Sequence, residues 1–252
     1  MNILLVNDDG FDSPWLHTLC RSAAARGHHV TVCAPAVQQS AKSHACTVSR
    51  PLLARKRHMD GAAEAWAIEG TPVDCSRIGF MSICKTKPDL VISGINNGYN
   101  TGFAVFVSGT VGAAREAAFQ GIPAMALSAE YNTPPETLSF FADWAILVGE
   151  RLVDYPAPAF SVCNLNVPPV PMWELKEPKM CGISHTVYKD DYDRRKSPRG
   201  DDYFWLTPLE TDYDSTPGSD MEWLSKGHIT CTFLTPDEGV DQERYADFLT
   251  EL

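Results

Sequence analysis

The sequence lacks several features that would assign it quickly to a class of protein. Its 252 residues hold no apolar run of the roughly 20 residues that a membrane-spanning helix needs. Its eight cysteines are scattered from Cys20 to Cys231, and no two of them form a C-x-x-C pair. This spacing disfavours a zinc motif or a disulfide framework and is typical of reduced thiols. Because Met1 leads directly into an apolar strand, we expect no signal peptide and a cytoplasmic location.

Positive charge is also scarce. The chain has 21 Lys and Arg against 32 Asp and Glu, which gives a formal net charge of −11. Nucleic-acid polymers and anionic membrane surfaces are bound mainly through basic patches, so we expect neither a nucleic acid nor a membrane as a partner. A small phosphate ester held by a metal ion is compatible with this charge, because the ion dominates the electric field at its own site.

Two common glycine-rich nucleotide signatures are missing as well. No G-K-[ST] sequence marks a P-loop, and no G-x-G-x-x-G follows the first expected strand. The first turn instead reads NDDGFDSP, whose acidic residues would repel a pyrophosphate that carries no metal. An NAD-dependent enzyme is therefore disfavoured.

Short apolar runs alternate with helical segments up to Pro168. The expected strands are Ile3–Val6, Val30–Ala34, Thr47–Lys56, Glu64–Glu69, Leu90–Ser93, Ile122–Ser128 and Phe160–Val167. The expected helices are Pro14–Arg26, Val73–Cys84, a segment from the Ser108–Ala114 turn to Gln120, and Pro135–Asp154. This alternation predicts an α/β core over residues 1–168 with a mostly parallel sheet.

The composition changes after Pro168, where prolines interrupt the chain repeatedly. Short strand-like pieces occur at Tyr203–Leu206 and His228–Leu234, and the charged segment Lys189–Asp202 is typical of a hairpin or loop. Val240–Leu252 is expected to form a short terminal helix. We interpret residues 169–252 as an irregular, β-rich extension of one domain spanning residues 1–252, used in assembly with other copies.

The first strand ends abruptly in charge, at Asp8 and Asp9. Ligands of open α/β sheets bind at the carboxyl ends of the strands, and paired carboxylates suit a hard divalent cation such as Mg²⁺ or Mn²⁺. Neighbouring side chains of a strand point to opposite faces, so one ion can take both only if the backbone turns, which Gly10 permits. The alternative is an acidic loop that caps the next helix.

Three further polar segments offer groups that can bind a metal or an anion. The loop Ala36–Cys46, which leaves the same edge as Asp8 if both strands are parallel, offers Ser40, Ser43 and His44, although a solvated loop is the better explanation of this segment by itself. The segment Gly94–Gly102 holds three asparagines that can offer oxygens to a metal or amides to a phosphate, namely Asn96, Asn97 and Asn100. The small residues of Ser108–Ala114 allow backbone N–H groups at a helix start to approach an anion, or simply allow close packing.

Four of these motifs occur together and in order: ILLVNDDG, QQSAKSH, SGINNGYNTG and VSGTVGAAREA. In this combination the sequence resembles the SurE (survival protein E) family of metal-dependent nucleotidases. The later motifs GTPVDC, NLNVP and YFWL also look like that family, so the resemblance covers nearly the whole chain.

The resemblance implies a Rossmann-like three-layer core and a 5′/3′-nucleotidase. Such an enzyme hydrolyses nucleoside 5′- and 3′-monophosphates to nucleoside and phosphate, and some members also shorten polyphosphate. It further implies one divalent metal per subunit, Mg²⁺ or Mn²⁺, and a homodimer or homotetramer. By motif, Asp8, Asp9, Ser40 and Asn96 would be the metal ligands. Asp8, Asp9 and Asn96 would also be catalytic, and Ser108, Gly109 and Thr110 would bind the phosphate.

The sequence departs from the family pattern at a few neighbouring positions. Ala36 and Val37 replace a common Asp-Arg, Asn97 stands where many members carry Arg, and Phe103-Ala104 replaces a frequent acidic pair. None of these changes removes an implied ligand. The alternative function is a non-catalytic nucleotide-binding or receiver-like module, which also places paired acids after an early strand but gives no role to SGIN.

Overall fold

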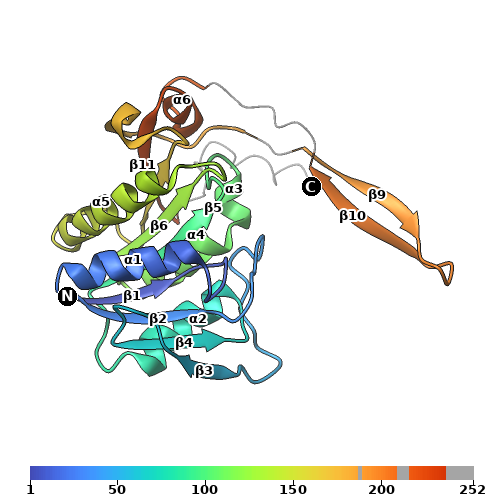
Figure 1. The fold of residues 1–252 in the computed structure, drawn as a ribbon, viewed down its shortest axis with the longest axis horizontal. Helices are drawn as coiled ribbons and strands as arrows, with labels where there is room; N and C mark the ends of the chain where they lie inside the picture. The colour runs from blue at the N-terminus through green and yellow to red at the C-terminus, as the bar shows by residue number, and fades with distance from the viewer. Residues whose placement is uncertain (187–188, 209–215, 237–252) are drawn as a thin grey trace, which may run out of the picture.

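The computed structural model describes residues 1–186, 189–208 and 216–236 (Figure 1). Its main feature is a sheet of nine strands in the order β3-β4-β2-β1-β5-β6-β7-β11-β8. These strands are β1 (Asn2–Val6), β2 (His29–Pro35), β3 (Ala54–Arg57), β4 (Glu64–Ile68), β5 (Leu90–Asn97), β6 (Ala124–Ala129), β7 (Val162–Val167), β8 (Lys176–Met180) and β11 (His228–Leu234). All neighbouring pairs are parallel except β3 with β4 and β7 with β11.

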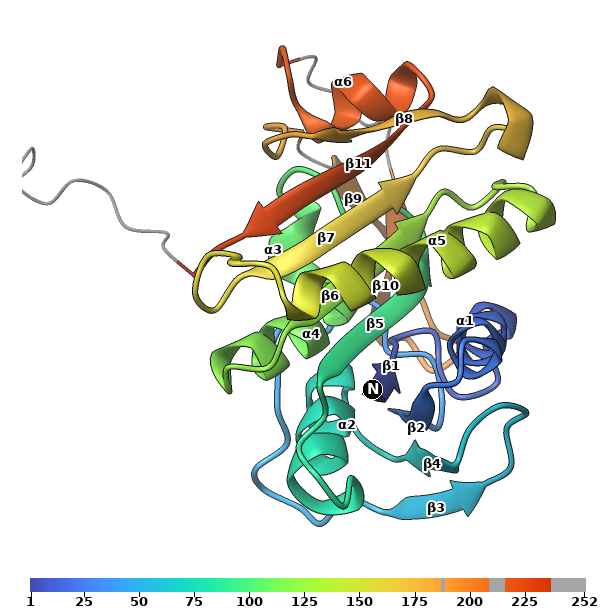
Figure 2. The ribbon, with the colours of Figure 1, turned by 90° about the vertical axis from the view of Figure 1, so that its left-hand side faces the viewer.

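Helices cover both faces of this sheet (Figures 1 and 2). They are α1 (Pro14–Ala25), α2 (Pro72–Ile78) with the π-helical turn η1 (Gly79–Ile83), α3 (Ala104–Val107), α4 (Gly109–Phe119), α5 (Pro135–Val153), the 3₁₀ turn η2 (Met172–Glu174) and α6 (Asp220–Ser225). The helices α1 and α5 pack on one face, and α2 and α4 pack on the other. The expected three-layer α/β fold is therefore confirmed. No helix in the described part of the chain is both long and apolar enough to span a membrane.

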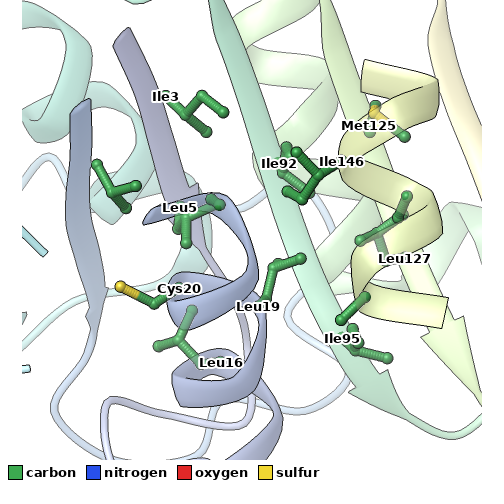
Figure 3. Packing of buried hydrophobic residues seen from close by; sticks show 14 of the residues in the cluster. Ile3, Leu5, Leu16, Leu19, Cys20, Ile92, Ile95, Met125, Leu127 and Ile146 are labelled. Carbon is green, nitrogen blue, oxygen red and sulfur yellow. The ribbon is translucent and has the colours of Figure 1, made fainter. Parts of the chain in front are cut away.

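The core follows from the alternation of side chains along β1. Ile3 and Leu5 pack with α1 and α5, whereas Leu4 and Val6 pack with α2 and α4. Figure 3 shows the first of these layers, where Ile3 and Leu5 lie beside residues of α1 and of β5. Since both faces of the strand are buried, an unbroken apolar run was required, and the sequence supplies one.

Two strands of the core differ from their predicted bounds by more than two residues at one end. Only Ala54–Arg57 of the expected strand Thr47–Lys56 pairs, because the Thr47 amide and hydroxyl instead donate to the Asp74 carboxylate at the start of α2. β5 runs on to Asn97 instead of ending at Ser93, with an irregularity between Ser93 and Asn96. Gly94 lies in that irregularity at φ +138°, where a Cβ atom would come within 2.4 Å of the Leu127 carbonyl oxygen.

The extension is more regular than expected. β11 pairs antiparallel with β7, and β8 pairs parallel with β11, so both complete the sheet of the core. The charged segment supplies β9 (Asp190–Lys196) and the turn of a hairpin whose second strand is β10 (Asp202–Pro208). This hairpin projects from the body of the molecule (Figure 1). The expected terminal helix Val240–Leu252 lies outside the described residues.

One buried carboxylate joins the extension to the loop after β5. Asp220 is fully buried at the start of α6. Its two oxygens accept hydrogen bonds from the backbone amides of Gly102 (2.9 Å), Ser184 (2.9 Å) and Met221 (2.8 Å). A buried carboxylate is stable only when such donors replace water, so α6 and the Gly102 segment hold each other in place.

Asp220→Asn is expected to destabilise the protein by about 1–3 kcal/mol, because the new NH₂ group would face a backbone N–H and leave it without an acceptor. Urea-unfolding midpoints measure this loss. Asp60→Asn is the control, because the Asp60 side chain is 78% exposed and pairs only with His58 at the surface. Equal midpoints for the two variants would contradict the assigned role of Asp220.

Candidate metal and phosphate site

The candidate site lies where the order of strands reverses. The chain passes outward from β1 to β2 and later returns to place β5 on the other side of β1. Ligand sites of doubly wound sheets form at the carboxyl ends of strands at such a point. Asp8 and Asp9 follow β1, and Asn96 lies near the end of β5.

The two carboxylates lie within a small turn that directly follows β1. The Asn7 side chain donates to the Gly10 carbonyl oxygen (2.9 Å) and accepts from the Gly10 amide (3.2 Å). Gly10 adopts φ +100°, and a Cβ atom there would lie 3.2 Å from the Gln38 backbone. Gly10 thus allows both the turn and the close approach of the next loop.

Asp8 lies in the narrow space between β1 and α4. Its side chain is 4% exposed, and its Oδ1 atom accepts a hydrogen bond from the Thr110 hydroxyl (2.5 Å). A Cβ atom on Gly109 would lie 3.2 Å from Asp8 Cβ, so the glycine lets the first turn of α4 approach the carboxylate. Asp8 therefore contacts the segment that was predicted to bind phosphate.

Both carboxyl groups are easier to protonate than free aspartate. Burial, assisted by the charge of Asp9, raises the pKa of Asp8 from 3.8 to about 6, and the Thr110 hydroxyl opposes this shift. Burial also raises the pKa of Asp9, although the Asn97 amide, which donates to its Oδ2 atom (3.2 Å), acts in the opposite direction. Two adjacent acids held in this way favour a positive charge between them.

The loop that carries Ser40 is tied to the same turn. The Gln39 amide donates to the Asp8 carbonyl oxygen (2.7 Å), and Ser40, the next residue, is exposed. Further along, Ser43 donates to the carbonyl oxygens of Val107 (2.9 Å, from its amide) and Phe106 (2.6 Å, from its hydroxyl). The loop therefore bridges the end of β1 and the segment that precedes α4.

His44 of this loop lies against α4 rather than in solvent. Its Nε2 atom pairs with Glu116 (2.8 Å), and its ring stacks on Phe119 at a centroid distance of 5.5 Å. Arg77 pairs with the other oxygen of Glu116 (3.4 Å). These contacts explain how the loop is anchored and assign His44 a structural part.

Asn96 presents one polar atom to the site. Its NH₂ group donates to the Gly98 carbonyl oxygen (2.7 Å), so the side-chain oxygen is the atom available to a cation. Asn100, by contrast, is 4% exposed and belongs to a buried network with Ser128, Asn164 and Asn166. Of these two asparagines, Asn96 is suited to a ligand and Asn100 supports the loop.

The start of α4 offers backbone amides. The Ser108 hydroxyl accepts from the Val111 amide (3.1 Å) as the N-cap, and the Thr110 hydroxyl is directed to Asp8. The first amides of a helix have no carbonyl partner within it, and they carry partial positive charge. The Ser108 amide is already used, because it donates to the Ala104 carbonyl oxygen (3.1 Å). An anion at Ser108, Gly109 and Thr110 would therefore be held mainly by the amides of Gly109 and Thr110 rather than by hydroxyl groups.

A hollow of about 510 Å³ opens beside Asp9. It is lined by residues 9–15 and 36–38 and by Asn97. Its walls include Trp15, a half-buried residue in the first turn of α1. The hollow is large enough for part of a small molecule beside Asp9.

The donor set fits a hard cation. Within the described residues, no group of three or more His, Cys, Asp or Glu side chains is arranged to hold a metal. Asp8 and Asp9 supply two carboxylates, and the remaining oxygens on the neighbouring segments belong to an amide and a hydroxyl. An oxygen-only set of this kind suits Mg²⁺ or Mn²⁺ rather than zinc or copper.

The fold and the site define an open α/β protein with an acidic, oxygen-rich centre beside a helix start. A family model described as Survival protein SurE matches residues 3–190, and the chain therefore belongs to the SurE family. A crystal structure of the SurE protein from Aquifex aeolicus superimposes with a TM-score of 0.80 at 29% identity, covering 99% of this chain and 100% of that chain.

Curated relatives carry the name 5′-nucleotidase SurE. The relative from Maridesulfovibrio salexigens is 40% identical over 234 residues, which cover 93% of this chain and 92% of that protein. The relative from Thermosipho melanesiensis is 37% identical over 257 residues, which cover 98% of each. The expected family resemblance is confirmed.

The family resemblance assigned the acidic turn, the Ser40 loop, the Asn96 segment and the start of α4 to one site, and the structure brings these four segments together. Sequence reasoning missed the hydrogen bond from Thr110 to Asp8 and the role of Asp220. The spacing of Asn7 and Gly10 is a local signal for the turn. The bond between Gly102 and Asp220 joins residues 118 positions apart, so no local pattern in the sequence indicates it.

Asp8→Asn should stabilise the metal-free protein at neutral pH. The pKa of Asp8 is about 6 in the folded protein, above its ordinary value of 3.8. The free energy of unfolding therefore falls as the pH rises from the lower to the higher of these values, by on the order of 2–3 kcal/mol in all. Asparagine removes the ionisation and keeps an acceptor for Thr110. In a chelator, the variant should melt several degrees above wild type at pH 7.5, and the gap should narrow towards pH 4.5.

Asp60→Asn serves again as the exposed control and should leave the melting temperature unchanged at both pH values. A lower melting temperature for Asp8→Asn at pH 7.5 would show that the Asp8 charge is already compensated by the protein.

Proposed function

We propose that this protein is a divalent-metal-dependent phosphomonoesterase that hydrolyses nucleoside 5′-monophosphates to nucleoside and phosphate. The names of the curated relatives support the 5′-nucleotidase activity. Hydrolysis of 3′-monophosphates and of short polyphosphate belongs to the same proposal, because both substrates present a terminal phosphoryl group to the same chemistry.

One observation carries this proposal. The buried Asp8 carboxylate lies directly against the start of α4, and the half-buried Asp9 follows it in the chain, so the proposed cation site adjoins the proposed anion site. A receiver-like or purely binding module would need the paired acids but not the Asn96 segment or the α4 amides beside them.

We assign the metal to Asp8, Asp9, Ser40 and Asn96. When bound, Mg²⁺ or Mn²⁺ would neutralise phosphoryl charge and lower the pKa of a coordinated water. The raised pKa values of both aspartates support this assignment, because a cation restores their charged forms.

The residues of the chain would bind the phosphoryl group and orient the two carboxylates. The amides of Gly109 and Thr110 would donate to phosphoryl oxygens beside Ser108, whose own amide already donates to the Ala104 carbonyl oxygen (3.1 Å). This donation strengthens as negative charge builds up. The Thr110 hydroxyl fixes the Asp8 carboxylate, and the Asn97 amide fixes Asp9. Phosphoryl transfer depends mainly on such positioning and charge stabilisation, so no covalent nucleophile from the chain is required.

The decisive experiment is release of phosphate from nucleoside monophosphates. Wild type stripped with a chelator should be inactive, and Mg²⁺ or Mn²⁺ should restore turnover. Asp9→Asn should lower turnover by about 100-fold or more at limiting metal, because the amide keeps one oxygen but removes the charge that balances the cation, and excess metal should restore part of it.

Asp60→Asn is the control for this variant. The Asp60 side chain is 78% exposed, pairs with His58 and does not line the hollow beside Asp9. Asp60→Asn should retain most of the activity. Full activity of the chelator-treated enzyme, or wild-type turnover by Asp9→Asn in limiting metal, would remove the basis of the proposed function.

We further propose that residues 1–252 form one domain and that the hairpin of β9 and β10 joins copies into a dimer or tetramer. Tyr192, Phe204 and Trp205 are 62%, 56% and 62% exposed on this hairpin. An isolated two-stranded ribbon is marginal in water, and exposed aromatic side chains are typical of interfaces. The eight free thiols also support the proposed cytoplasmic location.

Replacing Phe204 and Trp205 by serine should shift the sedimentation coefficient of the protein towards that of the monomer. Trp173→Ser is the matched control, because Trp173 is 73% exposed but lies on the body of the molecule. An unchanged assembly in the hairpin variant, or a monomeric wild type at micromolar concentration, would count against this interface.

A further inference from the structure

A group of sulfur-containing side chains lies far along the sheet from the acidic turn, on strands β7, β11 and β8. Cys163 and Cys231 approach each other with a sulfur-to-sulfur distance of 3.6 Å, and both are free thiols. Figure 2 shows the three strands side by side, with α5 lying across the sheet next to β7.

The pairing of the strands places a third sulfur on the same face. Met180 is the direct partner of Cys231 in the parallel pair of β8 and β11, and directly paired residues share a face. Cys163 is paired with Phe233, two residues beyond Cys231, and is therefore the diagonal neighbour of Cys231 on that face. Three adjacent strands thus carry three sulfur atoms in a row.

All three residues line one hollow of about 260 Å³ between the end of α5 and the sheet. Its other walls are Val148, Arg151, Leu152, Tyr155 and Phe233. Exposure rises from Cys163 (2%) through the half-buried Cys231 to Met180 (63%), so the sulfurs lead from the floor of the hollow to its rim. A small ion has a route from solvent to both thiols.

We propose that Cys163, Cys231 and Met180 form a binding site for a soft monovalent metal ion, Cu(I). Thiolate and thioether sulfurs select Cu(I), whereas a structural zinc site normally has four ligands drawn from Cys, His and carboxylates. Among the described residues that line the hollow, none has an imidazole or carboxylate side chain, so three sulfurs are what it offers.

The spacing of the thiols suits two bonds to one ion. Metal–thiolate bonds of about 2.3 Å at tetrahedral or trigonal angles hold two sulfurs roughly 3.8–4.0 Å apart, so a small outward movement from 3.6 Å accommodates the ion. Binding releases the two thiol protons to solvent and involves no oxidation or reduction.

The neighbouring thiol makes Cys231 easier to deprotonate. The Cys163 thiol hydrogen-bonds to the Cys231 sulfur and lowers the pKa of Cys231, while the same contact and burial raise the pKa of Cys163. Arg151, which also lines the hollow, carries a positive charge that balances the net negative charge of two thiolates with one monovalent ion.

The test is a titration of the reduced, metal-free protein with Cu(I) held by bicinchoninate, whose colour reports copper that the protein withdraws. Wild type should withdraw one Cu(I) per chain. Cys231→Ser should weaken the affinity by more than the roughly 10- to 100-fold that loss of an outer-shell partner costs, because a direct ligand is lost. Met180→Leu, a change at an exposed position, should also weaken it measurably.

Cys181→Ser is the matched control. The Cys181 thiol lies next to Met180 but is directed to Thr232 and the Cys231 carbonyl oxygen, on the opposite face of the sheet, and this variant should bind copper as wild type does. Cys46→Ser removes the exposed thiol and should likewise have no effect. Melting temperatures identify any variant that fails to fold.

Copper left entirely on bicinchoninate by wild type, or equal uptake by wild type and Cys163→Ser/Cys231→Ser, would overturn the proposal. A disulfide between Cys163 and Cys231 that persists in the wild-type protein under reducing conditions would overturn the proposal as well. Asp9→Asn should withdraw copper normally, so this result is independent of the proposed nucleotidase function.

Discussion

The structure around the site depends on the buried negative charge at the end of β1. An apolar strand that ends in two acids places both carboxylates at the edge of a low-dielectric core, where ionisation is unfavourable. The fold compensates with the Thr110 hydroxyl for Asp8 and the Asn97 amide for Asp9. The approach of α4, the glycine at position 109 and the turn at Gly10 all follow from the need to bring such donors close.

These hydrogen bonds only partly offset the effect of burial on the two aspartates, and the remaining effect bears on the chemistry of the site. Hydrogen bonds from neutral groups lower the pKa values of both aspartates less than burial raises them. An unbalanced negative potential of this kind favours a nearby cation, which is the physical basis of the proposed metal site. The metal-free protein gives up stability locally at the position where the proposed function needs charge.

The parts that the sequence predicted well are those determined by neighbours along the chain. The run Ile3–Val6 predicts a strand buried on both faces, and its parity directs Asp8 towards α4. Parallel order then brings the segments after β2 and β5 to the same edge. The prediction failed where partners are remote. Thr47 bonds to Asp74 instead of extending a strand, and β11 joins β7 because its buried face matches that of a strand formed much earlier.

The bond between Gly102 and Asp220 has a consequence for biosynthesis. The loop that follows Asn96 is fastened by a carboxylate 118 residues later, next to a strand that must return to the sheet from beyond the hairpin. Contacts of such separation form late, since the intervening chain must first be closed into a loop. On the ribosome, the acidic turn is made at the beginning of synthesis, but its surroundings are completed only after nearly the whole chain has emerged. A truncated product would therefore expose a pair of poorly shielded acids without a finished pocket around them.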